Sequence, residues 1–216
     1  MNRNHTLFWI ILFGVSFGFV ESSVVVYLRA LYYPDGFSFP LKVMESSHIL
    51  VELAREIMTI VMLAAAGVLA GKTRWQKFSY FMIAFAVWDI FYYLWLKVIL
   101  GWPVTLFDWD ILFLIPIPWI SPVIAPVAIS IIMIVTGILI IRQEEKEGTF
   151  TPSIIQWILA ILGTAILLLS FMIDLGASLR VQQPQPYRYD LFVLGLCCYI
   201  GGLWLAFFRR RGSNKS

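Results

Sequence analysis

The sequence predicts an all-α integral membrane protein, a bundle of six transmembrane helices with both termini in the cytoplasm. Hydrophobic residues make up 60% of the 216 residues, charged residues make up only 13%, and six apolar stretches are long enough to cross a bilayer. A soluble domain is about half apolar and about one quarter charged, so this chain has too little polar surface to cover a water-soluble globule. The formal net charge of +3 is small, which argues against a nucleic-acid partner.

Each predicted span is a run of roughly 20 mainly apolar residues, the length with which an α-helix crosses the hydrocarbon core. Together the spans leave no separate soluble domain, so residues 1–216 are expected to form a single membrane domain. The runs cover residues 7–28, 48–70, 78–100, 122–141, 154–175 and 191–208.

Local signals mark the starts of three spans. Thr73 and Gln76 have the spacing of a capping box before the third span. The dipeptides Ser121-Pro122 and Thr151-Pro152 have the N-cap and proline pattern of a helix start. We therefore expect the fourth and fifth helices to begin at these dipeptides.

The distribution of basic residues predicts the orientation. Ten lysines and arginines fall in the N-terminus, the loops at residues 71–77 and 142–152 and the C-terminal tail, whereas the other three loops contain four. Because cytoplasmic loops carry the excess of basic residues, both termini are expected on the cytoplasmic side of the cell (inner) membrane.

Small residues predict where helices pack closely. Gly14, Gly18 and Ser22 recur at every fourth position of the first span, and Gly67 and Gly71 do so in the second. Such spacing lets helix backbones approach each other in a membrane. The first two helices are therefore expected inside the bundle.

A proline-rich stretch precedes the fourth span. Pro116, Pro118, Pro122 and Pro126 follow one another closely, which predicts an interfacial or re-entrant segment from Asp110 to Trp119. Non-helical backbone at membrane depth has to be shielded by protein or line a wet cavity.

Ionisable residues inside spans are costly and are therefore functional hypotheses. On the second helix the spacing of three, four and four residues predicts one acidic stripe, which descends about 16 Å from the outer interface. The first and third helices add acidic side chains at the same level, so three helices direct carboxylates into one volume. The side chains concerned are Glu21, Glu45, His48, Glu52, Glu56 and Asp89.

The leading hypothesis is an intramembrane metalloenzyme with a site on the outer, periplasmic side. Carboxylates with one imidazole suit iron, manganese or zinc, and one or two divalent ions would offset the excess negative charge. Glu56, Arg55 and Tyr93 are the expected catalytic residues, acting as proton relay, as a cation that holds a carboxylate and as a hydrogen-bond donor. The expected metal ligands are Glu21, Glu45, His48, Glu52 and Asp89.

Redox or hydrolytic chemistry on a lipidic or small apolar substrate would fit such a site. Residues 29–43, an aromatic-rich outer loop, could cover its entrance. Two alternatives stay open: a cation- or proton-coupled transporter, and an accessory subunit whose acidic side chains face a membrane-protein partner or a second copy. Purely structural roles also stay open for several residues. Lys97 could reach outward to the interface, and Asp108-Trp109-Asp110 could form a solvated turn.

Overall fold

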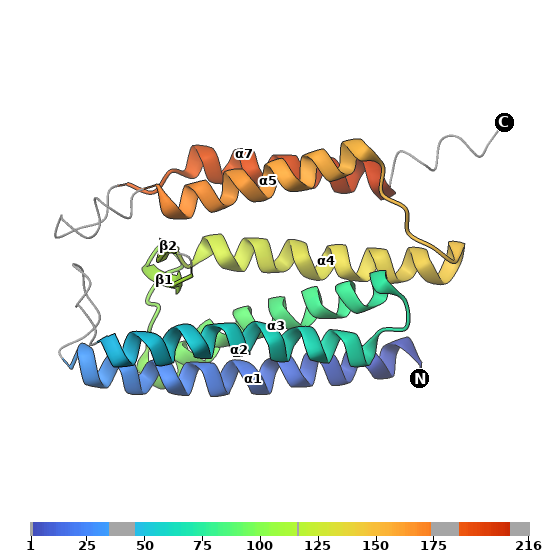
Figure 1. Cartoon of the computed structure of the whole chain (residues 1–216). Helices are drawn as coiled ribbons and strands as arrows, with labels where there is room; N and C mark the ends of the chain where they lie inside the picture. Colours follow the sequence, from blue (N-terminus) through green and yellow to red (C-terminus); the bar gives the residue numbers. More distant parts are fainter. Residues whose placement is uncertain (1, 35–45, 116, 174–185, 208–216) are drawn as a thin grey trace.

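The computed structural model describes residues 2–34, 46–115, 117–173 and 186–207. Within these ranges the chain is helical apart from one short β-hairpin (Figure 1). The elements are α1 (Arg3–Tyr32), α2 (Ser46–Ala70), α3 (Arg74–Leu100), β1 (Trp109–Phe113), β2 (Trp119–Pro122), α4 (Ile124–Glu147), α5 (Ile154–Met172) and α7 (Tyr189–Phe207).

All six described helices are long and apolar enough to cross a membrane, and each of them overlaps one of the six predicted spans. They run beyond several of the apolar stretches, because polar residues at the ends continue the helix. Successive helices alternate in direction, so α1 begins and α7 ends at the same end of the bundle (Figure 1). The cytoplasmic position of that end stays a prediction.

Helix α3 is the centre of the packing. Helices α1, α2 and α4 each contact it along their length, whereas α5 and α7 pack chiefly on each other. The first two helices were expected in the interior of the bundle, but α3 is the most buried of the six described helices. The reason is that α1 and α2 use their small residues to approach α3, and their other faces stay exposed. The main core cluster joins these four helices through Ile10, Leu63, Tyr80, Ile83, Ala84, Val87, Trp88 and Ile141.

The predicted small-residue stripe on α1 lies directly against α3. A Cβ atom added at Gly18 would lie 3.0 Å from the Trp88 carbonyl oxygen and 3.1 Å from the Tyr92 nitrogen. One turn further on, the Ser22 hydroxyl donates to the Tyr92 carbonyl at 3.0 Å. This close approach sets the position of Glu21 relative to α3.

Two of the three predicted helix starts differ from the structure. Thr73 does cap α3, accepting from the Gln76 N–H at 3.1 Å. Helix α5 is instead capped by Ser153, two residues after Thr151, in a full capping box with Gln156. The Ser121-Pro122 pair ends strand β2 instead of starting α4. The N-cap of α4 is Val123, and the Ser121 hydroxyl donates to the Pro122 carbonyl at 3.1 Å.

The proline-rich segment is non-helical, as predicted, and forms an antiparallel hairpin. Asp110 pairs with Ser121 and Ile111 with Ile120, and the register shifts between Ile111 and Phe113. The hairpin leads directly into α4, on the side where α1 ends and α2 begins (Figure 1). Pro116 lies outside the described residues. The hairpin pairs with itself and contacts α4, α5 and the Glu56 side chain of α2.

Candidate functional site

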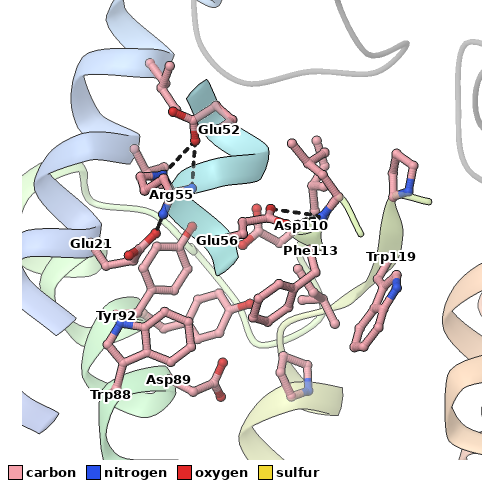
Figure 2. Close-up of a pocket in the computed structure, with 18 of the residues that line it drawn as sticks. Glu21, Glu52, Arg55, Glu56, Trp88, Asp89, Tyr92, Asp110, Phe113 and Trp119 are labelled. Carbon is pink, nitrogen blue, oxygen red and sulfur yellow. Dashed lines mark hydrogen bonds and ion pairs between the residues drawn. The ribbon is translucent and has the colours of Figure 1, made fainter. Parts of the chain in front are cut away.

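A pocket of about 560 Å³ lies between the ends of α1, α2 and α3 and the hairpin. Residues at the start of α4 and at the end of α5 complete the lining of the pocket. This volume is within the range of small-molecule sites, which is roughly 300–1,000 Å³. Most of its lining is aliphatic or aromatic, and seven ionisable aspartate, glutamate and arginine side chains interrupt it (Figure 2).

Arg55 of α2 joins two of the acidic side chains. Its Nε donates to Glu52 Oε2 at 2.8 Å, and its Nη1 forms an ion pair with Glu21 of α1. Figure 2 shows the guanidinium between the two carboxylates. The Thr59 hydroxyl also donates to Glu21, at 3.3 Å. Glu21 and Glu52 thus share one built-in cation, and this cation ties α1 to α2.

Glu56 holds the hairpin. The Leu114 N–H, at the end of β1, donates to both oxygens of its carboxylate at 2.9 and 3.0 Å. Glu56 is buried, with 7% of its surface exposed. Because both oxygens point at the backbone of the turn (Figure 2), this side chain positions the pocket wall.

Asp89 of α3 has a different environment. Its Oδ2 accepts a hydrogen bond from the Ser130 hydroxyl of α4 at 2.8 Å. Its side chain lines the pocket, and within the described residues no cation forms an ion pair with it. An isolated carboxylate in apolar surroundings is costly, so Asp89 has to be protonated or to face a cation that the pocket binds.

Asp110 of β1 is the second carboxyl with unused capacity. Its Oδ1 lies 3.3 Å from Arg29 Nη2 of α1, and the same guanidinium stacks on the Trp102 ring. Only 3% of Asp110 is exposed, and its buried Oδ2 makes no hydrogen bond of normal geometry in the described part of the chain. Burial raises the pKa of the Asp110 carboxyl to about 6. The charge of Arg29 opposes this shift most, followed by hydrogen bonds from the Ile111 backbone and from the Tyr93 and Tyr92 hydroxyls.

Aromatic side chains form a continuous wall around the deeper part of the pocket. We call this the aromatic wall: Phe85, Trp88, Phe113, Trp119 and Phe171. Neighbouring ring centroids are 5.3–6.4 Å apart, from Phe85 and Trp88 across Phe113 to Trp119 and Phe171. The hairpin is therefore what connects the aromatic residues of α3 with those of α5.

The negative and positive charges of the pocket lining are unequal in number. Five carboxyl groups and two guanidinium groups line it, so three negative charges remain if all are ionised. An excess of negative charge in this volume was also expected from the sequence. Lys97 is not part of the lining. It donates to the carbonyl oxygens of Pro103 at 2.7 Å and Gly101 at 3.2 Å.

The structure brings together most of the predicted site residues. Glu21, Glu52, Arg55, Glu56, Asp89 and Tyr93 all line the pocket. His48 does not: its Nδ1 forms a hydrogen bond with the Tyr32 hydroxyl. Glu45 lies outside the described residues. Among the residues that the structure does describe, no three histidine, cysteine, aspartate or glutamate side chains could hold a metal ion together.

Two ionisable residues of the pocket, Asp110 and Arg29, were not among the predicted site residues. Asp110 was expected in a solvated turn, and Arg29 was counted only for orientation. Asp108 does behave as a turn residue, accepting from the Val104 N–H and the Thr105 hydroxyl at 2.7 Å each. The signal for Asp110 was its position as a single acid inside the otherwise apolar run 109–120.

Comparison with known proteins does not assign this chain to a family. The chain matches no family model, no curated protein and no solved structure.

Proposed function

We propose that this protein is an intramembrane enzyme that transfers protons to and from an apolar, lipid-dissolved substrate. The observation that carries the proposal is Asp89, a carboxyl group on the wall of an apolar pocket with one hydroxyl partner and no cation among the described residues. A carboxyl group in such surroundings suits general acid–base chemistry.

The other polar residues have supporting roles in this proposal. Arg55 fixes Glu21 and Glu52, and Glu56 fixes the hairpin, so all four are positioning residues. Tyr93 and Asp110 also line the pocket, where a hydroxyl and a second carboxyl can relay or orient the proton. This changes the expected roles of Glu56 and Arg55 from catalysis to positioning.

The pocket also favours some substrates over others. Both of its guanidinium groups are engaged, Arg55 by two glutamates and Arg29 by Asp110 and the Trp102 ring. No cation of the described lining is thus free to neutralise a phosphate or carboxylate head group. We therefore expect a neutral or cationic lipid-soluble substrate.

The test compares lipids from cells that lack this gene and receive either the wild-type gene or Asp89→Asn. Asparagine keeps the size of the side chain and can still accept from Ser130, but it cannot transfer a proton. We expect a neutral or cationic lipid to change in amount with the wild type only, as measured by mass spectrometry of lipid extracts. Identical lipid profiles with equal amounts of folded protein would overturn the proposal.

Metal-dependent chemistry stays a second hypothesis. The sequence pattern that motivated it includes Glu45, outside the described residues, while Glu21 and Glu52 are satisfied by Arg55. Metal analysis of protein purified in mild detergent tests it, with His48→Ala and Glu52→Ala alongside. Near-stoichiometric iron, manganese or zinc, lost in both variants, would support it. The transporter and accessory-subunit alternatives also stay predictions.

A further inference from the structure

We propose that the pocket contains a subsite for a positive charge carried on an apolar frame, next to Asp89 and Asp110 and against the aromatic wall. This inference deepens the proposed function and rests on the same pocket. It names the feature that the substrate, or an intermediate formed from it, has to carry.

The first argument is the charge of the lining. The carboxyl groups outnumber the guanidinium groups by five to two. Arg55 is shared between Glu21 and Glu52, and Arg29 lies beside Asp110. A positive charge in the pocket would be attracted by the remaining excess, and a negative charge would be repelled.

The second argument is the unused hydrogen-bonding capacity of two carboxyl groups. Asp110 is 97% buried and lines the pocket. The hydroxyls of Tyr93 and Tyr92 act on its carboxyl, but its Oδ2 makes no hydrogen bond of normal geometry in the described part of the chain. Asp89 has only the Ser130 hydroxyl as a described hydrogen-bond partner. Buried polar atoms in native proteins nearly always have partners, so an unsatisfied carboxyl oxygen at a pocket indicates a ligand that would satisfy it.

The third argument is the aromatic wall. The face of an aromatic ring attracts a cation within about 6 Å of its centroid, and tryptophan does so best. Trp88 directly precedes Asp89 in α3. Trp119, on the hairpin, lies on the other side of the pocket (Figure 2). The rings of the aromatic wall can bury the apolar part of a ligand, and their faces would also stabilise a cation beside the two carboxyl groups.

Such a charge can come from two sources. A lipophilic amine or ammonium compound brings it permanently. Alternatively, Asp89 protonates a carbon–carbon double bond: the carboxyl O–H bond breaks, a C–H bond forms, and the neighbouring carbon becomes cationic. Loss of a proton from an adjacent carbon to the carboxylate then makes a new double bond and restores the acid. The second route isomerises or cyclises an unsaturated chain and needs no oxidant or reductant.

The first arm of the experiment measures binding of radiolabelled decyltrimethylammonium to the full-length protein in lipid nanodiscs. Decanol and decanoate serve as neutral and anionic probes of the same chain length. We expect saturable binding of the ammonium compound alone, weakened at least tenfold by Asp89→Asn and by Asp110→Asn. Asp190→Asn is the matched control, because Asp190 is an exposed aspartate at the start of α7, outside the pocket lining.

Equal binding of the ammonium compound and decanol would overturn the inference. Unchanged ammonium binding by the Asp89→Asn and Asp110→Asn variants would do the same, with circular dichroism confirming that they are folded. The proposed function fails separately, through an unchanged lipid profile, so the two failures are distinguishable.

The second arm distinguishes the two sources once the first has succeeded. The protein is incubated with squalene, a polyene, in D₂O. Deuterium incorporated by the wild type and not by Asp89→Asn supports the transient cation. Ammonium binding without deuterium incorporation supports a lipophilic amine as the ligand. Both results retain the same subsite.

Discussion

The Glu56 carboxylate of α2 accepts the Leu114 N–H of the hairpin with both of its oxygens, at 2.9 and 3.0 Å. A side chain in the second helix thereby holds a turn that lies 58 residues further along the chain. This contact ties α2 to the hairpin, which carries Phe113 and Trp119 of the aromatic wall.

Glu56→Ala is expected to destabilise the protein by about 1–3 kcal/mol, the usual cost of leaving a buried donor such as the Leu114 N–H unsatisfied. Glu56→Gln should cost less, because its amide oxygen still accepts one hydrogen bond. Thermal unfolding in mild detergent measures both changes, and hydrogen exchange should rise at residues 109–115. Equal stability of the two variants would show that Glu56 does not hold the hairpin.

Removal of the Arg55 guanidinium should be more damaging. Arg55→Met leaves Glu21 and Glu52 buried without their shared cation, and loss of one partner from a buried ion pair typically costs about 3–5 kcal/mol. The triple replacement Glu21→Gln, Glu52→Gln and Arg55→Met removes all three charges and should recover much of the loss. Both proteins are compared by unfolding temperature in the same detergent. A triple variant no more stable than Arg55→Met would contradict the ion-pair explanation.

Helix packing gives a prediction with a matched control. Gly18→Leu has to displace α1 from the backbone of α3, because a Cβ atom there already meets the Trp88 carbonyl at 3.0 Å. Overpacking of this kind costs about 1–3 kcal/mol, and it should also weaken the Glu21–Arg55 pair one turn away. Gly201→Leu, where an added Cβ meets nothing within 4 Å, should leave the unfolding temperature nearly unchanged. Equal effects of the two substitutions would reject the proposed contact.

The six helices could be predicted from the sequence, because each is a continuous apolar run. The small-residue stripe on α1 likewise predicts close packing against another helix. Antiparallel neighbours of known length also place Glu21, Glu52 and Asp89 at one level. The rotation of each helix about its axis is harder to predict, since lipid-facing and protein-facing sides are both apolar. Arg55 therefore could not be assigned to two glutamates in advance.

The hairpin and Asp110 were not predictable for a different reason. The residue types of 109–122 alternate poorly and include three prolines, so no strand period is visible. An acid in a short loop is solvated unless distant residues cover it. Asp110 is buried only because Arg29 of α1, together with Tyr92 and Tyr93 of α3, lies against the hairpin.

Asp110 should make the stability of the protein depend on pH. Its pKa is about 6 in the folded protein, above the ordinary value of 3.8, so folding favours the protonated carboxyl. The resulting stabilisation is complete below about pH 4 and is lost as the pH rises through 6, by about 3 kcal/mol in total at 1.36 kcal/mol per pKa unit. Arg29, Tyr92, Tyr93 and Asp89 are the charged or titratable groups that act on it.

Asp110→Asn should remove this dependence. The difference in unfolding free energy between wild type and variant is therefore expected to change between pH 4 and pH 7, in favour of the variant at the higher pH. Denaturant unfolding at several pH values measures it. A constant difference over this range would mean that Asp110 titrates at its ordinary pKa.

The orientation of the bundle is testable with single cysteines. The ten-to-four distribution of basic residues predicts that the hairpin end of the bundle lies outside the cell. Cys197 and Cys198 are the free cysteines and are first replaced by serine. Leu106→Cys, exposed before the hairpin, should then react with a membrane-impermeant maleimide in intact cells. Thr149→Cys, exposed after α4, should react only after the membrane is opened. The reverse pattern would put the pocket on the cytoplasmic side, and its substrate would then have to arrive from the inner leaflet.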